Sequence, residues 1–427
     1  MNLISKRIRG MQDILPGESE KWEYVENVLK KKSKLFGFKI IRTPVLEHTN
    51  LFERTSGETS DIVKKEMYTF LDKGERSVSL RPEGTAGVLR AVLENGLHDG
   101  NLPLKLMYVS SCYRYEKPQS GRYREFFQFG LEIFGGKSAL ADAEVICVAK
   151  SIFNDLGIKN LELEINAVGC KECKSAYNKA LENYFIVHKE NLCELCGDRL
   201  ERNPMRIFDC KNDKCKNICK NAPTVLEYLC AQCALHLEHL KEYLEVFNIK
   251  YRVNPHIVRG LDYYTKTVFE FIINSGEAPL TVCGGGRYDN LSKELGGADM
   301  CAVGFGIGLE RLLLIMQDQK LSFGGNSNIH VYVIPLGETC KNKSIEISQR
   351  LRNIGIATEQ DIVGRNLKSQ MKYANKIKCD YCIFCGNQEI ENNTVKIKNM
   401  SAGNEFTLNL DEDFEKYFLN LTNSKLQ

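Results

Sequence analysis

Apolar side chains recur at helical spacing in several segments of the chain. The first segment follows the Pro16-Gly17 turn, ends before Gly37, and has apolar residues at Trp22, Val25, Val28, Leu29 and Leu35. A spacing of three to four residues places such side chains on one face of a helix. The same pattern predicts further helices at about 137–157, 174–187 and 308–317.

Short β-rich runs dominate the chain between Met67 and Phe134. Two of them, residues 104–109 and 126–129, are separated by a segment with Gly and Pro turn signals. Strands joined in this way favour an antiparallel sheet over a repeated strand–helix–strand unit. We therefore predict an α+β domain on an antiparallel sheet, with further strands near 38–42, 161–166, 251–253 and 267–273.

The chain divides into segments of different character. Residues 170–248 are rich in Cys and Lys and interrupt the strand pattern, which predicts an insertion. The polar stretch 322–328 has the composition of a linker. Strands and helices alternate beyond it, which predicts a separate α/β domain of about a hundred residues. We expect a larger domain at about 1–325 and a smaller one at about 329–427.

The composition is 43% hydrophobic and 26% charged, as in folded globular proteins. No stretch reaches the ~20 consecutive apolar residues that span a bilayer, and residues 1–18 lack the apolar run of a secretory signal. We therefore expect a cytoplasmic protein without a membrane partner. The net charge of +3 is too small to predict nucleic-acid binding, so the location of the charges must decide that question.

The chain contains 17 cysteines, which in a long chain without a signal are expected as thiols, metal ligands or small core residues. One segment holds Cys170, Cys173, Cys193, Cys196, Cys210, Cys215, Cys219, Cys230 and Cys233. Within it, the C-x2-C pairs Cys193/Cys196 and Cys230/Cys233 resemble two zinc knuckles, and four thiolates suit tetrahedral Zn²⁺.

Chain geometry favours placing these two knuckles in one structural zinc site. A helix at about 174–187 would carry the chain outward by roughly 21 Å. A helix at about 234–247 would then return it to the strand at Tyr251. Both knuckles would meet at the distal end, with Cys170 and Cys173 near the core. Free thiols are the alternative, and the ligand set stays open because the segment also holds Cys210, Cys215 and Cys219.

Two motifs combine arginine with residues that suit an anion site. In Arg114-Tyr115-Glu116, strand alternation would put the cation and the anion on one face. Arg311 follows the alternating glycines of residues 304–308 and begins a predicted helix. For the first motif alone, the alternative is an ordinary ion-pair network. For the second motif alone, it is a tight packing contact. Together, the two motifs predict a nucleotide triphosphate site.

A third motif combines an arginine with a pair of tyrosines. Residues 258–264 read Val-Arg-Gly-Leu-Asp-Tyr-Tyr, and residues 284–289 follow as Gly-Gly-Gly-Arg-Tyr-Asp. Such residues could stabilise a phosphate and donate hydroxyls to a small polar ligand. Buried tyrosines beside a surface arginine are the alternative.

These motifs resemble those of the class II aminoacyl-tRNA synthetases. Residues 37–46 are similar to motif 1, residues 114–126 to motif 2 and residues 304–313 to motif 3, in the family order. Residues 259–264 and 285–289 resemble two signatures of the histidyl-tRNA synthetases.

The resemblance to the histidyl enzymes covers nearly the whole chain, from Arg9 to about Leu410, and includes residues 80–86 as their amino-acid-binding turn. It implies a ligase that activates histidine with ATP and Mg²⁺ and transfers it to histidine tRNA. It also implies a homodimer, because motif 1 builds a dimer interface in this class.

The resemblance assigns histidine binding to Glu83, Gly84, Thr85, Arg114, Gln128, Glu132, Arg259, Tyr263 and Tyr264. Glu83 and Thr85 would hold the α-amino group, and Gln128 would reach the carboxylate. Glu132 and Tyr264 would bind the two imidazole nitrogens. An apolar amino acid would leave both partners unpaired, so high selectivity is expected without an editing domain.

The same resemblance assigns ATP binding to Arg114, Glu116, Phe126 and Arg311. Arg114 and Arg259 would flank the α-phosphate as catalytic residues, and Arg311 would hold the γ-phosphate. Glu116 and Phe126 would bracket adenine. Because the histidine carboxylate is the nucleophile, positioning and charge stabilisation suffice for catalysis. Phe127 stands where the family frequently has His, which bears on the detail of the adenine pocket.

The smaller domain carries a basic stripe at Arg365, Lys368, Lys372 and Lys376. Their spacing would place these side chains on one face of a helix, opposite Leu367, Met371 and Ala374. A solvated basic face is the commoner interpretation of such a stripe. The domain also resembles the anticodon-binding domain of several class II synthetases, which implies a tRNA-facing surface.

A noncatalytic relative is the alternative from another functional class. The synthetase-like regulatory subunit of histidine biosynthesis binds histidine without charging tRNA; such proteins lack the C-terminal domain and have degraded ATP motifs. This chain has Arg114, Arg259, Arg311 and residues 329–427, which favours the enzyme. Residues 259–264 together with Glu132 disfavour a class II enzyme for another amino acid.

Overall fold

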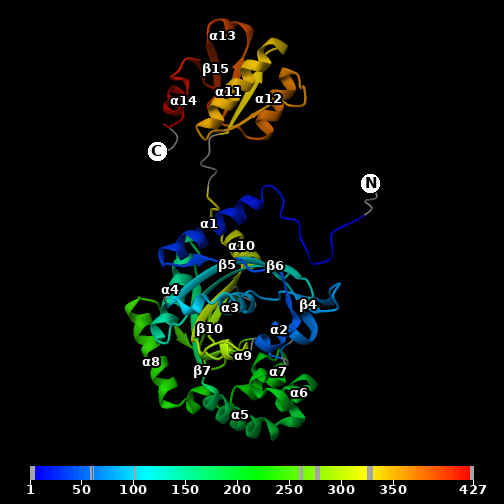
Figure 1. Ribbon diagram of the computed structural model, residues 1–427, viewed down its shortest axis with the longest axis vertical. Helices are drawn as coiled ribbons and strands as arrows, with labels where there is room; N and C mark the ends of the chain where they lie inside the picture. Colours follow the sequence, from blue (N-terminus) through cyan, green and yellow to red (C-terminus); the bar gives the residue numbers. More distant parts are fainter. Residues whose placement is uncertain are drawn as a thin grey trace. The chain divides into compact units, whose positions relative to one another are not determined.

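The computed structural model describes residues 5–57, 60, 62–100, 102–257, 259, 263–274, 279–324 and 330–423. The chain forms two compact units, Met1–Phe323 and Gly324–Gln427 (Figure 1). Across the described ranges, no helix is both long enough and apolar enough to span a bilayer.

The larger unit is built on an eight-stranded sheet with the order β1-β5-β6-β11-β10-β9-β7-β8. The central strands pair antiparallel, and the edge strands β1 and β8 pair in parallel with β5 and β7. The predicted antiparallel sheet is therefore confirmed. Its strands are β1 (Lys39–Ile40), β5 (Leu104–Tyr113), β6 (Glu125–Phe134), β7 (Leu161–Gly169), β8 (Arg252–Val253), β9 (Thr265–Asn274), β10 (Pro279–Arg287) and β11 (Ala302–Gly308).

Helices cover one face of this sheet and bury its main core. They are α1 (Ser19–Leu35), α4 (Ala139–Asp155), α8 (Ala231–Val246) and α10 (Leu309–Asp318). The sequence predicted all four, and Figure 1 shows α4 and α8 side by side. Gly37 has φ +82°, a conformation that favours glycine, which explains why the first helix ends where it does.

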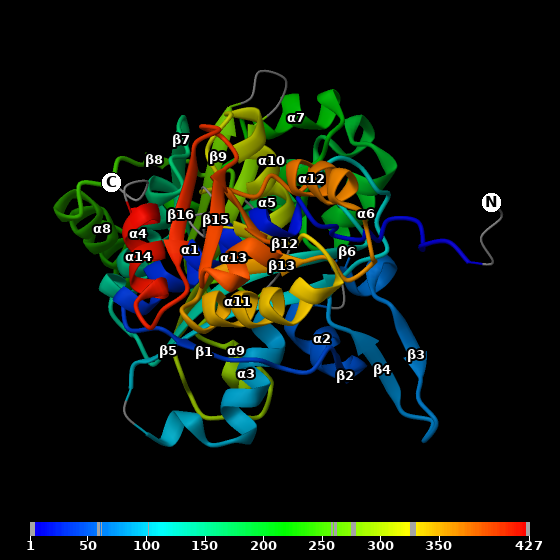
Figure 2. The same ribbon diagram turned by 90° about the horizontal axis from the view of Figure 1, so that it is seen from above.

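The opposite face of the sheet carries the second core cluster. Because side chains alternate along a strand, Met107 of β5 faces the helices, whereas Leu106 and Tyr108 face α3 (Thr85–Glu94) and α9 (Leu291–Glu294). A small sheet of β2 (Leu46–His48), β4 (Ser77–Leu80) and β3 (Thr69–Leu71) adjoins α2 (Thr49–Ser56). Figure 2 shows β3 and β4 extending from the unit as a hairpin.

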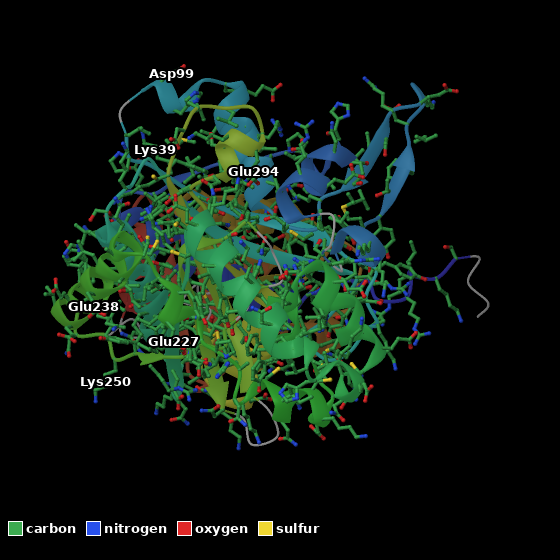
Figure 3. The ribbon with its side chains drawn as sticks, turned by 90° about the horizontal axis from the view of Figure 1, so that it is seen from below. Lys39, Asp99, Glu227, Glu238, Lys250 and Glu294 are labelled. Atoms are coloured by element: carbon green, nitrogen blue, oxygen red, sulfur yellow. The ribbon has the colours of Figure 1, made fainter. Side chains whose placement is uncertain are left out.

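The cysteine-rich segment folds as a small helical subdomain, viewed from its own side in Figure 3. It consists of α5 (Lys171–Ile186), α6 (Glu194–Arg202), the 3-10 helix η4 (Pro204–Asp209), α7 (Asp213–Cys219) and the 3-10 helix η5 (Val225–Tyr228). Helix α8, the last part of the predicted insertion, instead buries Leu237, Leu240 and Leu244 in the main core.

The smaller unit has a five-stranded sheet with the order β13-β12-β14-β15-β16. The predicted alternation is confirmed in β12 (His330–Pro335), α11 (Lys341–Asn353), β13 (Ala357–Gln360), α12 (Leu367–Lys376) and β14 (Tyr381–Cys385). The sequence did not predict the antiparallel strands β15 (Thr394–Asn399) and β16 (Glu405–Asn409), or the helices α13 (Asn387–Glu391) and α14 (Phe414–Asn423).

Candidate active site

Glycines of β10 and β11 make room for the predicted site residues. A Cβ atom at Gly304 would overlap the carboxylate of Glu132, and one at Gly284 would overlap the guanidinium of Arg259. A Cβ at Gly306 would lie 2.5 Å from Nε2 of Gln128. These glycines therefore accommodate functional side chains of the protein itself, which is why the strand sequence tolerates no side chain there.

Glu132 lies at the buried end of the site, with its side chain in a hydrogen-bonded network. The Thr85 hydroxyl donates to Glu132 Oε1 at 2.8 Å, and the Tyr288 hydroxyl donates to Oε2. The Tyr108 hydroxyl lies 3.4 Å from Oε1. Burial raises the pKa of Glu132 to about 8, because a charge is poorly solvated there. The carboxyl group is thus poised to share a proton with a bound base near neutral pH.

The predicted amino-acid-binding turn is tied to the same network. The Glu83 carboxylate accepts hydrogen bonds from the amides of Thr85 and Ala86, at 2.6 and 2.8 Å, at the start of α3. The Gly84 amide donates to Gln128 Oε1 at 3.0 Å. Gln128 and Glu132 lie on one face of β6 because they are four residues apart in a strand. The turn and the strand therefore form one wall of the site.

Tyr263 and Tyr264 are buried beside this wall. Their ring centroids are 4.7 Å apart, and Tyr263 lies 5.5 Å from Tyr288 in an edge-on contact. Burial raises the pKa of Tyr264, and the neighbouring Glu132 acts in the same direction. The tyrosines therefore remain neutral hydroxyl groups. Gly260, Leu261 and Asp262 of the same motif lie outside the described residues.

Beside the buried wall, a cleft of about 340 Å³ is lined by the predicted ATP-binding residues. Four arginines line it: Arg114, Arg122, Arg259 and Arg311. Burial lowers the pKa of Arg311, and the other three arginines lower it further because like charges repel. Such a concentration of cations in one cavity suits a polyanion, as a triphosphate is.

Each arginine is oriented by a partner in the protein. Arg259 forms an ion pair with Glu270. Arg311 Nη1 donates to the carbonyl of Thr281 at 3.0 Å, and Arg114 Nε donates to the carbonyl of Pro82 at 2.9 Å.

The Arg114 guanidinium also lies over the Phe126 ring, 5.2 Å from its centroid. Arg122 forms an ion pair with Glu116. The arrangement therefore brings together Arg114, Glu116, Phe126, Gln128, Arg259 and Arg311, all predicted site residues.

The expectation that Arg114 and Glu116 share one face of a strand is wrong. Strand β5 ends at Tyr113, and the Glu116 amide donates to the carbonyl of Arg114 at 2.8 Å, which turns the chain. Alternation therefore does not apply to this loop. The two side chains still approach to 4.0 Å, because the turn folds them back over the cleft.

Part of the expected basic helix face is also wrong. Helix α12 begins at Leu367, so Arg365 precedes it, paired with Asp361 at 2.7 Å and placed over the Tyr373 ring. Leu367 is 47% exposed, contrary to expectation, whereas Ala374 is buried and Met371 packs against the same core, as expected. The side chains of Lys368, Lys372 and Lys376 are exposed.

The expected pairing of the zinc knuckles is wrong. Thiols that could share a metal ion form two groups, Cys170/Cys173/Cys230/Cys233 and Cys193/Cys196/Cys210/Cys215. Helix α8 does not return the chain from the distal end. The return is made earlier, since η5 packs against α5 and β7. Cys230 therefore lies beside Cys173, whose Sγ accepts its amide hydrogen bond at 3.1 Å.

Several residues of the site were missed by the sequence analysis. Arg122 and Tyr288 stood inside quoted motifs without a role, and Glu270 meets Gly284 only through the pairing of β9 with β10. Glu310 accepts a hydrogen bond from the Phe127 amide at 2.8 Å, and burial raises its pKa to about 7. Its position directly before Arg311, at the start of a helix, was the available signal.

Comparison with known proteins gives two family matches. The family model described as "Histidyl-tRNA synthetase" matches residues 10–312, and the model described as "Anticodon binding domain" matches residues 330–420. The histidine–tRNA ligase of Clostridium novyi (strain NT) is 49% identical over 407 residues, which covers 95% of this chain and 97% of that protein.

Solved structures agree with the sequence matches. The apo histidyl-tRNA synthetase of S. aureus has a TM-score of 0.83 at 37% identity, covering 97% of this chain and all of that one. An ATP phosphoribosyltransferase regulatory subunit/histidyl-tRNA synthetase from Bacillus halodurans has a TM-score of 0.65 at 24% identity, covering 91% and 100%, which shows a shared fold alone. The chain belongs to the histidyl-tRNA synthetase family.

Proposed function

We propose that the chain is a histidine–tRNA ligase that works in two steps. The carboxylate of histidine attacks the α-phosphorus of ATP, which forms histidyl-adenylate and releases pyrophosphate. A hydroxyl at the 3′ end of histidine tRNA then attacks the carbonyl carbon of the adenylate, which forms the ester and releases AMP. Neither step needs a nucleophile from the protein, so binding, orientation and charge stabilisation are its contributions.

One observation carries this proposal: four arginines converge on a cleft that adjoins a buried glutamate. We assign the charge developing at the α-phosphate to Arg114 and Arg259, and the γ-phosphate to Arg311. Adenine would stack on the Phe126 ring, over which the Arg114 guanidinium lies in the structure. ATP binding therefore requires the Arg114 side chain to turn from the ring toward the phosphates.

Histidine would occupy the space between Glu132 and Tyr264. The carboxyl group takes one imidazole nitrogen and the phenol the other, while Glu83 and Thr85 receive the α-amino group and Gln128 the carboxylate. The Gly84 amide fixes the position of the turn through its hydrogen bond to Gln128, and the Tyr263 ring packs against the Tyr264 ring. Thr85 already donates to Glu132, so it also couples the two ends of the amino acid.

ATP in this class is used with Mg²⁺. Magnesium is usually held by one or two carboxylates together with substrate phosphates. Glu310 is a carboxylate that lines the cleft and fits this pattern, whereas Glu116 is assigned to adenine. The clusters of three or more metal-binding groups found among the described residues consist of cysteines in the insertion. The protein therefore offers Mg²⁺ a partial site that the triphosphate completes, and any Zn²⁺ in the insertion stands apart from both chemical steps.

The smaller unit would bind the anticodon region of the tRNA through the exposed lysines Lys368, Lys372 and Lys376, with Arg365 at the edge of this surface. Phosphate contacts of this kind give affinity that falls with salt. We also propose a homodimer formed through residues 37–46, where Ile40 and Val45 are exposed. We further propose a cytoplasmic location for the enzyme.

The regulatory-subunit alternative predicts histidine binding without chemistry. Histidine-dependent exchange of labelled pyrophosphate into ATP, tested with all twenty amino acids, separates the two functions. We expect exchange with histidine alone, and charging of histidine tRNA by the same preparation. Histidine binding without exchange would support the alternative and contradict the proposed enzyme.

A further inference from the structure

Eight cysteines of the insertion converge in two groups of four. In each group, the four Sγ atoms lie within 4.8 Å of one another. The Sγ–Sγ distance is 3.5 Å between Cys170 and Cys173 and 3.7 Å between Cys193 and Cys210. Four sulfurs bonded to one tetrahedral zinc at ~2.3 Å lie ~3.8 Å apart. Both groups therefore already have the spacing of a zinc tetrathiolate.

We propose that the insertion binds two structural Zn²⁺ ions, one held by Cys170, Cys173, Cys230 and Cys233 and the other by Cys193, Cys196, Cys210 and Cys215.

The first site joins the beginnings of two helices. Cys170 is the N-cap of α5 and Cys173 lies in its first turn, and Cys230 and Cys233 occupy the same positions in α8. Thiolates are stabilised at such positions because the free amides of a first turn carry a partial positive charge. Residue 170 directly follows β7, and α8 packs into the main core. This ion would therefore fasten both ends of the insertion to the catalytic sheet.

The second site is built at the distal end from three elements. Cys193 is the N-cap of α6 and Cys196 lies in its first turn. Cys210 follows η4, and Cys215 lies within α7. Helices α6 and α7 have only 9 and 7 residues, a length at which an isolated helix is marginal. The second ion would fix these short elements together.

Backbone amides are already aimed at the sulfurs. The Cys193 amide donates to Cys215 Sγ at 3.3 Å, and the Asn212 amide donates to Cys210 Sγ at 3.4 Å. In the first group, the Cys230 amide donates to Cys173 Sγ at 3.1 Å. Hydrogen bonds of this kind orient metal ligands and stabilise their negative charge.

Other cysteines of the chain show that this clustering is specific. Cys219 is buried in the same small core, yet its sulfur donates to the carbonyl of Ile207 and belongs to neither group. Cys379 and Cys382 lie 3.7 Å apart in the smaller unit, but within its described range, 330–423, they belong to no group of three or more metal-binding side chains. Neither a cysteine-rich core nor a C-x2-C spacing by itself therefore produces a fourfold group.

Two competing explanations fit the geometry less well. A disulfide joins two sulfurs at ~2.0 Å, so it does not account for four sulfurs gathered around one point. An iron–sulfur cluster places several atoms between its thiolates and would spread them more widely than these groups. Zinc also suits the small size of the subdomain, because a bound metal supplies folding free energy that a small core lacks.

The second ion would also affect the active site indirectly. Its ligand Cys210 directly follows the segment η4, whose Phe208 contacts His256 with ring centroids 5.3 Å apart. The last residue of η4, Asp209, is exposed and interacts electrostatically with Arg259. The metal would thus fix the position of a charge that acts on the catalytic arginine, and would take no part in the chemistry.

The test is metal analysis of the full-length chain, purified under reducing conditions without chelators. We expect about two equivalents of zinc per chain, each bound to four sulfurs at ~2.3 Å by X-ray absorption. Cys193→Ser and Cys230→Ser should each lose one equivalent, and the matched control Cys219→Ser should keep both. The wild-type measurement decides the matter even if a ligand variant does not fold.

The following results would overturn the proposal. Less than one equivalent of zinc in the wild type is one such result, and iron in place of zinc or nitrogen or oxygen ligands is another. A folded Cys193→Ser or Cys230→Ser protein with unchanged zinc content is a third. Disulfides between these cysteines in metal-free protein, detected by mass after alkylation without reduction, would overturn it as well.

Discussion

Replacing Glu132 by glutamine tests the histidine pocket most directly. The change keeps the size of the side chain and one oxygen acceptor, so one of the Thr85 and Tyr288 hydroxyls can still donate and the other can turn to accept from the new NH2 group. What is lost is the ability to share a proton with imidazole. Hydrogen bonds to charged groups contribute about 1.5–3 kcal/mol, which corresponds to roughly a 10- to 150-fold loss of kcat/KM for histidine.

The pH dependence gives the sharper criterion. The bound pair of Glu132 and imidazole holds one proton. The imidazole of free histidine is protonated below about pH 6.5, which would bring the pair to two protons. Glu132 of the free enzyme loses its proton above about pH 8, which would leave the pair with none. The wild-type kcat/KM for histidine should therefore fall on both sides of this window. Glutamine does not titrate, so the variant should keep the acid limb and lose the contribution of Glu132 to the alkaline limb.

The assay is pyrophosphate exchange with histidine and ATP varied separately, from pH 5.5 to 9.5. The KM for ATP should stay near the wild-type value, because Glu132 does not line the arginine cleft. Ionisation of the histidine α-amino group affects both proteins equally, so the comparison isolates the glutamate. Glu162→Gln, a strand glutamate hydrogen-bonded to Asn274 at the sheet edge, is the control. A folded Glu132→Gln protein with unchanged KM for histidine and an unchanged alkaline limb would refute the reasoning.

Three further predictions concern the arginines and the smaller unit. Arg259→Ala should reduce pyrophosphate exchange by ~10²–10³ with the circular dichroism spectrum preserved, because a preorganised cation at the α-phosphate is lost; near-normal exchange would exclude this role. Removal of residues 326–427 should leave adenylate formation in place and reduce tRNA charging steeply, and full charging by the truncated chain would exclude the anticodon-binding assignment. Arg287→Leu should lower the free energy of unfolding by about 3–5 kcal/mol in urea at pH 7, because it removes the guanidinium from the buried Asp142 carboxylate and leaves only His236, 3.5 Å away. Burial opposes ionisation of Asp142, but Arg287 and His236 together outweigh it and lower the pKa to about 2, so the contribution of these contacts is complete above pH ~4 and disappears as the pH falls through about 2; equal unfolding free energies at pH 7 would contradict this.

The sequence by itself determined the local elements and the inventory of chemistry. Periodicity located α1 and α10 because the spacing of apolar residues is a local property of the chain. The arginines Arg114, Arg259 and Arg311 could be named in advance because they lie in short motifs. The antiparallel character of the sheet was predicted from short β-rich runs joined by segments with Gly and Pro turn signals.

Only the tertiary structure decided which distant segments meet. Glu270 is paired with Gly284 across β9 and β10, and the Arg259 guanidinium lies over that glycine. Tyr288 reaches Glu132 over 156 positions. Arg114 and Glu116 left the strand pattern because a turn begins directly after β5. The cysteine spacings were visible in the sequence, yet their grouping depended on where the chain reverses direction. That reversal is made by a short 3-10 segment with no strong periodicity, so local spacing identified the cysteine pairs but not which pairs lie together.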